Sequence, residues 1–267
     1  MSDLLRAIDE LLRHDEILIA LDRDGTLVPY ANRPEEARVS DDLRNLIADL
    51  CSRRGLTIAV LSARSAAQLQ GDFDGTGVVM AGNYGMEVVL PDGTECIQPY
   101  ALNAVPELKT VRDELSELLD LSNGSILEDH GYSLCLHWHN VALSRRDEVH
   151  TAVLATADRH ADVKFRRLPT SYEVLPNIPW DKGMGLAFID SSTAHGNRSR
   201  VHFFAGDTES DSPGFEYVNE RAGISVRVGH DGERLRAKHW LPTPGDLHEV
   251  LRYIASQRDI CLDRAPA

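Results

Sequence analysis

The sequence has little cysteine and no long apolar run. Its four cysteines, Cys51, Cys96, Cys135 and Cys261, are scattered and form no C-x-x-C pair. This spacing argues against a disulfide framework or a zinc site and is typical of reduced thiols in a cytoplasmic protein. No stretch approaches the roughly 18 apolar residues that a membrane helix needs. The acidic segment 1–16 also lacks the apolar run of a secretory signal. We therefore expect a cytoplasmic chain without membrane contact.

Positive charge is also scarce. Lysine and arginine number 28 against 42 aspartates and glutamates, so the net charge is −14. This balance disfavours a nucleic-acid partner, which would require a basic face, so we expect none. It would also repel an anionic substrate at long range, so any phosphate site must supply its own local positive charge. The oligomeric state stays open at this point.

The stretch 17–27 combines a short apolar run with two acidic residues. Ile17 to Leu21 are all apolar, which predicts a strand buried on both faces. Asp22 and Asp24 follow at its carboxyl end, where open α/β sheets place their ligand sites. Both carboxylates can approach one centre, and their repulsion favours a hard cation such as Mg²⁺. An ordinary D-x-D-G surface turn is the alternative, but it would not require a buried strand before it.

The pattern of the whole chain predicts an α/β protein. Apolar runs at 56–61, 78–81, 201–205 and 224–228 alternate with amphipathic helices, which favours a parallel sheet with covering helices. Between them the pattern changes. A helix beginning at Pro106, strands at 125–128 and 132–139, a helix at 144–160 and two further strands predict an inserted α/β cap. We expect three segments: core 1–101, cap 102–177 and core 178–267.

Polar residues with a shared chemical logic stand at the ends of the predicted core strands or at a helix start. They are Asp22, Asp24, Ser62, Lys182, Asp207 and Asp211. A carboxylate can attack phosphorus, and a second carboxylic acid can protonate the leaving alcohol and then activate water. A hydroxyl and an ammonium group can bind phosphoryl oxygens. Singly, each residue has an ordinary explanation as a helix cap or a solvated charge; together they indicate phosphoryl transfer.

In these motifs the sequence resembles the haloacid dehalogenase-like phosphohydrolases. Asp22-Arg23-Asp24-Gly25-Thr26 is similar to their first motif, and Ser62, Lys182 and Gly206-Asp207 with Asp211 match the other three. Within that superfamily it looks most like the trehalose-6-phosphate phosphatases, through Ser62-Ala63-Arg64 and 82–87. The resemblance implies a Rossmann-like parallel-sheet core with an inserted α/β cap.

The resemblance also implies roles for single residues. Asp22 would be the nucleophile and Asp24 the general acid/base, while Ser62 and Lys182 would hold the phosphoryl group. Mg²⁺ would be bound by Asp22, the Asp24 carbonyl and Asp207, with Asp211 supporting the site. The remaining candidates for substrate binding in the core are Thr26, Arg64 and Asn83; the last two could equally stabilise loops.

Sugar contacts are implied for the predicted cap. The matching positions are Glu128, His130 and Glu173. His130 stands where the family carries lysine, and it is shorter and usually neutral at pH 7. Tyr84 and Thr208 also depart from the family pattern, but neither belongs to the catalytic set.

His137 and His139 lie two positions apart on a predicted strand. A transition-metal site there would need a third ligand, and none is near in the sequence. We favour a polar strand edge over a metal site, with substrate contact by this region, including Trp138, as a further interpretation.

The leading hypothesis is a Mg²⁺-dependent phosphatase acting on a sugar phosphate, with trehalose 6-phosphate as the best candidate. Another disaccharide or pseudo-sugar phosphate, or a glycosylglycerate phosphate, would also suit such a cap. A phosphomutase and a non-catalytic sugar-phosphate sensor are the alternative hypotheses.

Overall fold

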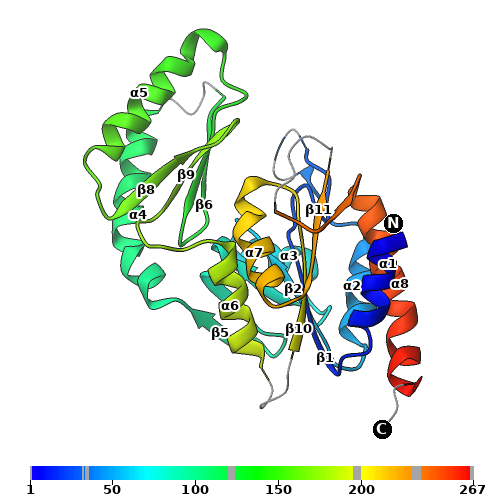
Figure 1. Cartoon of the computed structure of the whole chain (residues 1–267). Coiled ribbons are helices and arrows are strands. Elements are labelled where there is room, and N and C mark those ends of the chain that lie inside the picture. Colours follow the sequence, from blue (N-terminus) through cyan, green and yellow to red (C-terminus); the bar gives the residue numbers. More distant parts are fainter. Residues whose placement is uncertain are drawn as a thin grey trace. The chain divides into compact units, whose positions relative to one another are not determined.

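The computed structural model describes residues 2–31, 33, 36–119, 124–194, 200–229 and 236–264. Its contacts divide the chain into two compact units. The core unit comprises Met1–Cys96 and Trp180–Ala267, and the cap unit comprises Ile97–Pro179. Figure 1 shows the cap unit, drawn largely in green, as one continuous insertion in the chain.

The core unit is built around β1 (Glu16–Leu21), which is buried on both faces as predicted. Ile17, Ile19 and Leu21 pack into one apolar cluster together with residues of the helices near both termini. Leu18 and Ala20 pack into a second cluster on the opposite face. Because both faces are apolar and covered, the buried residues 17–21 are all apolar, and the next polar residue is Asp22 at the carboxyl end.

The core sheet has eight strands in the order β12-β11-β10-β1-β2-β3-β4-β5. Strands β12 to β3 in that order pair in parallel, and β3 pairs with β4 antiparallel. The other strands are β2 (Leu56–Leu61), β3 (Val79–Gly82), β4 (Glu87–Val89), β5 (Glu95–Ile97), β10 (Arg200–Gly206), β11 (Ile224–Val228) and β12 (His239–Leu241). The helices are α1 (Ser2–Leu11), α2 (Asp41–Cys51), α3 (Ala66–Phe73), α6 (Lys182–Thr193), α7 (Ser212–Glu220) and α8 (Pro244–Arg264).

The structure confirms the predicted α/β class and the parallel sheet. It adds α7 and β12, for which the sequence analysis gave no prediction. The four parallel strands β10, β1, β2 and β3 end at one edge of the sheet, because parallel strands share their direction. The residues that follow three of them include Asp22, Ser62 and Asp207.

The cap unit is a four-stranded antiparallel sheet in the order β6-β7-β9-β8 with helices packed on one face. Its elements are α4 (Pro99–Leu118), β6 (Ile126–Asp129), β7 (Leu134–His137), α5 (Arg146–Ala157), β8 (Val163–Arg167) and β9 (Ser171–Pro176). Leu134, Leu136 and Trp138 pack into the cap core, as their alternation predicts, while Cys135 and His137 lie on the other face.

The predicted start of the first cap helix at Pro106 is wrong, because α4 begins at Pro99 and contains Pro106. Proline is favoured in the first turn, where its missing N–H has no intrahelical partner. Pro106 instead leaves the Leu102 carbonyl without its usual bond. The helix continues through it because Ala104 and Leu108, on either side, are buried in the cap core.

Candidate active site

A buried lysine joins two carboxylates at the carboxyl edge of the core sheet. Lys182 is the first residue of α6, and the side chain of the N-cap Asp181 accepts a hydrogen bond from the Met184 backbone. Lys182 Nζ donates to Asp22 Oδ1 at 2.6 Å and to Asp211 Oδ1 at 2.5 Å. Burial opposes the lysine charge, but the two carboxylates raise its pKa above the ordinary value. Lys182 is therefore a fixed cation at this edge of the sheet, in a chain whose net charge repels anions.

Three carboxylates converge beside that lysine. Oxygens of Asp22, Asp207 and Asp211 lie within 4.8 Å of one another. Burial and mutual repulsion raise the pKa of Asp22 well above its ordinary value, although Lys182 acts in the opposite direction. The same two causes raise the pKa of Asp207 to about 6. One ammonium group leaves this cluster with excess negative charge, and a hard divalent cation would neutralise it, so the residues fit the predicted Mg²⁺ site.

The acidic loop after β10 folds on itself. Asp211 Oδ2 accepts hydrogen bonds from the backbone N–H groups of Asp207 and Thr208 at 3.1 and 2.9 Å. This leaves its Oδ1 for Lys182. Asp211 is completely buried. It thus holds both the loop that carries Asp207 and the lysine, which agrees with a supporting role.

Tyr30 and Gly25 surround the Asp207 carboxylate, and the sequence analysis singled out neither of them for this role. The Tyr30 hydroxyl donates to Asp207 Oδ2 at 2.9 Å. Gly25 has φ +87°, and a methyl group on it would overlap the Asp207 carboxylate and the Tyr30 ring. Glycine is thus required here both by the backbone conformation and by the close approach.

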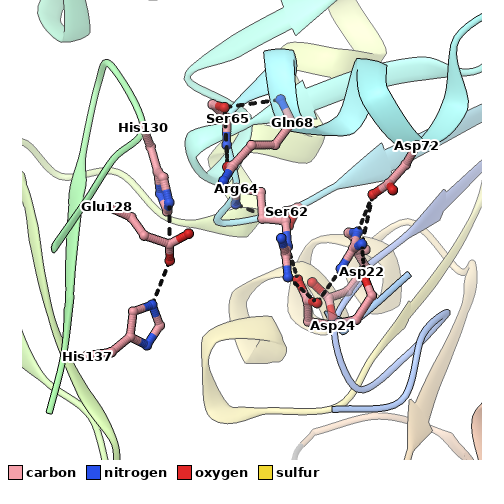
Figure 2. A network of polar contacts seen from close by, with 12 residues as sticks. Asp22, Asp24, Ser62, Arg64, Ser65, Gln68, Asp72, Glu128, His130 and His137 are labelled. Carbon is pink, nitrogen blue, oxygen red and sulfur yellow. Dashed lines mark hydrogen bonds and ion pairs between the residues drawn. The ribbon is translucent and has the colours of Figure 1, made fainter. Parts of the chain in front are cut away.

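The Asp24 carboxylate contacts two arginines. Arg64 donates to it through Nε at 2.7 Å and Nη2 at 3.0 Å, and Arg23 contacts it as well. Arg23 is buried and also donates through Nε to Asp72 at 2.8 Å. Figure 2 shows Arg64 and Asp72 near Asp24. The prediction placed both motif carboxylates at one centre, whereas the converging group consists of Asp22, Asp207 and Asp211.

Two loops fix Ser62 at the end of β2. The backbone N–H groups of Asn83 and Tyr84 donate to the Arg64 and Ser62 carbonyls, both at 2.8 Å. Asn83 is completely buried, and its side chain donates to Glu87 at 2.6 Å. These contacts favour the loop-stabilising interpretation of Asn83 over the substrate-binding one. Ser62 and Arg64 are both held in place by this arrangement.

Thr26 closes the first motif. Its side chain is completely buried, and Oγ1 has no hydrogen-bond partner among the residues that the structure describes. A buried hydroxyl without a partner is costly. The predicted contact with substrate would supply a hydrogen-bond partner for this hydroxyl.

The predicted sugar-binding residues all lie in the cap unit. Glu128 Oε2 is 2.6 Å from His137 Nε2 and 3.8 Å from His130 Nε2. Glu173, on β9, accepts from Arg166 Nε at 2.8 Å. The sequence analysis missed Arg166, because only the sheet register makes it the neighbour of Glu173.

Comparison with known proteins decides the family. The sequence profile of the trehalose-phosphatase family matches residues 20–240. The chain belongs to this family. It is therefore a phosphatase, as its motifs predicted.

Other members of the trehalose-phosphatase family are similar over nearly the whole chain. The "Trehalose-phosphate phosphatase" of Mycobacterium tuberculosis is 31% identical over 269 residues, which cover 96% of this chain and 67% of that protein. The "Probable trehalose-phosphate phosphatase 2" of Oryza sativa subsp. japonica is 26% identical, with 94% and 71% covered. The chain thus spans about two thirds of the length of these relatives.

Solved structures show that the fold is shared. The C-terminal domain of the Candida albicans trehalose-6-phosphate phosphatase matches with a TM-score of 0.79 at 20% identity, covering 96% of each chain. A haloacid dehalogenase-like hydrolase from Bacteroides thetaiotaomicron matches with a TM-score of 0.60 at 15% identity, covering 90% of this chain and 99% of that one. The predicted haloacid dehalogenase-like fold is confirmed. No helix within the described ranges is long and apolar enough to cross a membrane.

Proposed function

We propose that this phosphatase hydrolyses trehalose 6-phosphate to trehalose and phosphate, in a Mg²⁺-dependent reaction through an aspartyl-phosphate. Family membership and the names of the similar proteins support the substrate. The observation that carries the chemistry is the buried Asp22 held by Lys182 beside Asp207 and Asp211. A carboxylate held in this way is oriented and partly desolvated, as a nucleophile requires.

Asp22 makes the first attack. One of its oxygens forms a bond to phosphorus while the ester P–O bond breaks, and the electron pair leaves with the sugar oxygen. Asp24, protonated at this step, gives its proton to that oxygen, so trehalose leaves as the neutral alcohol. The product left on the enzyme is a phosphoryl group on Asp22.

Asp24 then acts as the base. Its carboxylate takes a proton from a water molecule whose oxygen attacks phosphorus, and the Asp22 O–P bond breaks. Phosphate leaves and Asp22 returns to its carboxylate form. In the structure Asp24 lies against Arg64 at 2.7 Å, so the acid form requires that this ion pair open when substrate binds. A phosphoryl oxygen is a competing partner for the Arg64 guanidinium.

Local cations offset the long-range repulsion of an anionic substrate that the net charge of −14 predicts. Lys182 and Arg64 present charged N–H groups, and Ser62 offers a hydroxyl, so all three can bind phosphoryl oxygens. Lys182 stays protonated because its pKa is raised. The phosphate site is thus cationic within an acidic protein.

The Mg²⁺ ligands would be Asp22, Asp207 and the Asp24 carbonyl, with Asp211 orienting the loop. The ion, when bound, would neutralise the charge that the nucleophile and the phosphoryl group share. Sugar recognition is assigned to Glu128, His130 and Glu173, whose carboxylates and imidazole can bind hydroxyl groups.

The test is an assay of phosphate release by the purified chain. The panel contains trehalose 6-phosphate, other disaccharide phosphates and a glycosylglycerate phosphate, each with Mg²⁺ and with a chelator. We expect release that is fastest from trehalose 6-phosphate and lost on chelation. Absence of release from every member, with folded protein, would overturn the proposal. Conversion to an isomeric sugar phosphate would instead identify a phosphomutase, and binding without turnover would identify a sensor.

A further inference from the structure

The polar face of the cap sheet carries three different metal-binding groups at one place. Donor atoms of Glu128, Cys135 and His137 lie within 4.8 Å of one another. Carboxylate, thiolate and imidazole together are ligands that suit Zn²⁺ and similar transition metals, whereas Mg²⁺ prefers oxygen alone. We propose that these three residues bind one transition-metal ion of the zinc class, with His130 as the fourth ligand.

The sheet register fixes these groups. Glu128 on β6 stands directly opposite Cys135 on β7, and His137 follows two positions along β7 on the same face. On the opposite face Leu134 and Leu136 are buried under the helices of the cap unit. These three donors therefore stand on a rigid sheet, which is the more favourable support for a metal site, and His130 directly follows the end of β6.

The two histidines already converge on the carboxylate. His137 Nε2 is 2.6 Å from Glu128 Oε2, and His130 Nε2 is 3.8 Å from the same oxygen. Figure 2 shows both imidazoles pointing toward the Glu128 carboxylate. The carboxylate oxygen and both imidazole nitrogens therefore already face one place on the sheet.

The surrounding charge also favours a cation. Cys135 stands opposite Glu173 on its other side, and Glu173 is neutralised by Arg166. Glu128, Cys135, Glu173 and Arg166 are neighbours across the four strands. With Glu173 paired to Arg166, the charge of Glu128 is the one left without a compensating charge in this row. A divalent ion with Glu128, the Cys135 thiolate and neutral imidazoles forms a neutral site. Binding would release the thiol proton, and any imidazolium proton, to the buffer.

Metal binding would affect catalysis if the proposed sugar contacts hold, and this consequence rests on the proposed function. An ion bound to Glu128 and His130 withdraws both from the sugar. We expect Zn²⁺ to inhibit hydrolysis of trehalose 6-phosphate in excess Mg²⁺, and His137→Gln to reduce that inhibition. The binding experiment below uses no substrate, so its result stands whatever the enzyme hydrolyses.

The test is a titration of the metal-free, reduced chain of 267 residues with Co²⁺ in excess Mg²⁺, which is added to fill the proposed oxygen-rich site. Co²⁺ bound by a thiolate gives a near-ultraviolet charge-transfer band, and Zn²⁺ then displaces it. We expect one equivalent of Co²⁺ with this band. The band should disappear in Cys135→Ser, and affinity should fall more than about 100-fold in His137→Gln, since a direct ligand matters more than an outer partner.

Matched controls are Cys261→Ser and His14→Gln, which lie in the core unit and should keep the wild-type titration. Circular dichroism checks that each variant is folded. Absence of the band in the wild type would overturn the proposal, and so would wild-type affinity in either folded cap variant. If Cys135→Ser does not fold, His137→Gln decides the question alone.

Discussion

At the residue scale, the aspartates of the active site differ through their partners. Asp22 is bound by a lysine, Asp24 by two arginines, and Asp207 by a tyrosine hydroxyl. A carboxylate fixed by one ammonium group keeps a second oxygen for attack. A carboxylate held by arginines can be released when an anion competes for them. The assigned division of labour between nucleophile and acid/base agrees with these environments.

Replacement of Asp22, the proposed nucleophile, tests the proposed covalent mechanism. We expect Asp22→Asn to lose at least about 10⁴-fold in turnover, because the amide cannot form the phosphoryl intermediate. Phosphate-release kinetics measure the loss. Asp158→Asn, an exposed change of the same kind in the cap unit, should leave the rate unchanged. Turnover near the wild-type level in Asp22→Asn would rule out the covalent route.

Gly25 offers a second test at this scale. Gly25→Ala adds backbone strain at positive φ, which costs about 1–3 kcal/mol, and displaces the Asp207 carboxylate. We expect lower stability in urea unfolding together with weaker Mg²⁺ activation. Gly93→Ala has a similar φ of +85° with open space around the added methyl. It should lose comparable stability yet keep its Mg²⁺ response; equal Mg²⁺ responses in the two variants would contradict the packing argument.

The sequence predicted the types of the site residues better than their contacts. An apolar run ending in aspartate is a local pattern, so Asp22 was accessible from the sequence. The pairing of Asp24 with Arg64 joins residues 40 positions apart, and that of Tyr30 with Asp207 joins residues 177 apart. No local pattern specifies such contacts. The same limit applies to Glu128: it lies on β6, and only the strand pairing brings it beside Cys135 and His137 on β7.

At the scale of elements, a helix cap positions one of the candidate catalytic groups. Asp181 caps α6 and thereby fixes Lys182 in its first turn. We expect Asp181→Ala to cost about 1 kcal/mol of stability and also to lower turnover. Ser40→Ala removes an equivalent cap from α2, where Ser40 accepts from the Leu43 backbone. It should cost similar stability without changing turnover; kinetics and urea unfolding of both variants give the comparison.

A pH-sensitive contact joins α4 to the segment that follows α5. His160 Nδ1 is 2.6 Å from Glu107, and its Nε2 is 3.1 Å from Glu114. Burial opposes the imidazolium, but the two glutamates raise the pKa of His160 above its ordinary value of 6.5. A raised pKa gives stability that is present below pH 6.5 and lost as the pH rises through the raised value.

We therefore expect the stability difference between wild type and His160→Gln to shrink from about pH 5.5 to about pH 8.5. His150 provides the contrast, because burial and Arg167 lower its pKa. The difference between wild type and His150→Gln should grow over the same range. Urea midpoints at each pH measure both, and parallel trends in the two variants would contradict the assignment.

Elements were predicted well where one pattern dominates. The buried strands β1 and β2 and the helix capped by Ser40 agree with the sequence analysis. The start of α4 was missed because a proline can begin a helix or lie inside one, and burial of Ala104 decides between them. Short β12 has three residues, too few for an alternation to be recognised.

At the scale of the whole molecule, the proposed Mg²⁺ site predicts a link between metal binding and stability. A ligand that binds only the folded state stabilises it by about 2.7 kcal/mol at 100 times its dissociation constant. We expect saturating Mg²⁺ to raise the melting temperature of the wild type and a chelator to reverse the shift. Asp207→Asn should lose most of this shift, and Asp158→Asn should keep it. An equal shift in Asp207→Asn would place the ion elsewhere.

The described cores of the two units share no buried residue. The cap cluster is drawn from residues 104–174, and both core-unit clusters come from residues outside the insertion. A substitution on the polar face of the cap sheet therefore changes the stability of the cap unit and leaves the packing around β1 unchanged. Evolution can vary the face that we assign to sugar recognition without compensating changes around the nucleophile. The substrate range can thus change in the cap unit while the reaction carried out in the core unit stays the same.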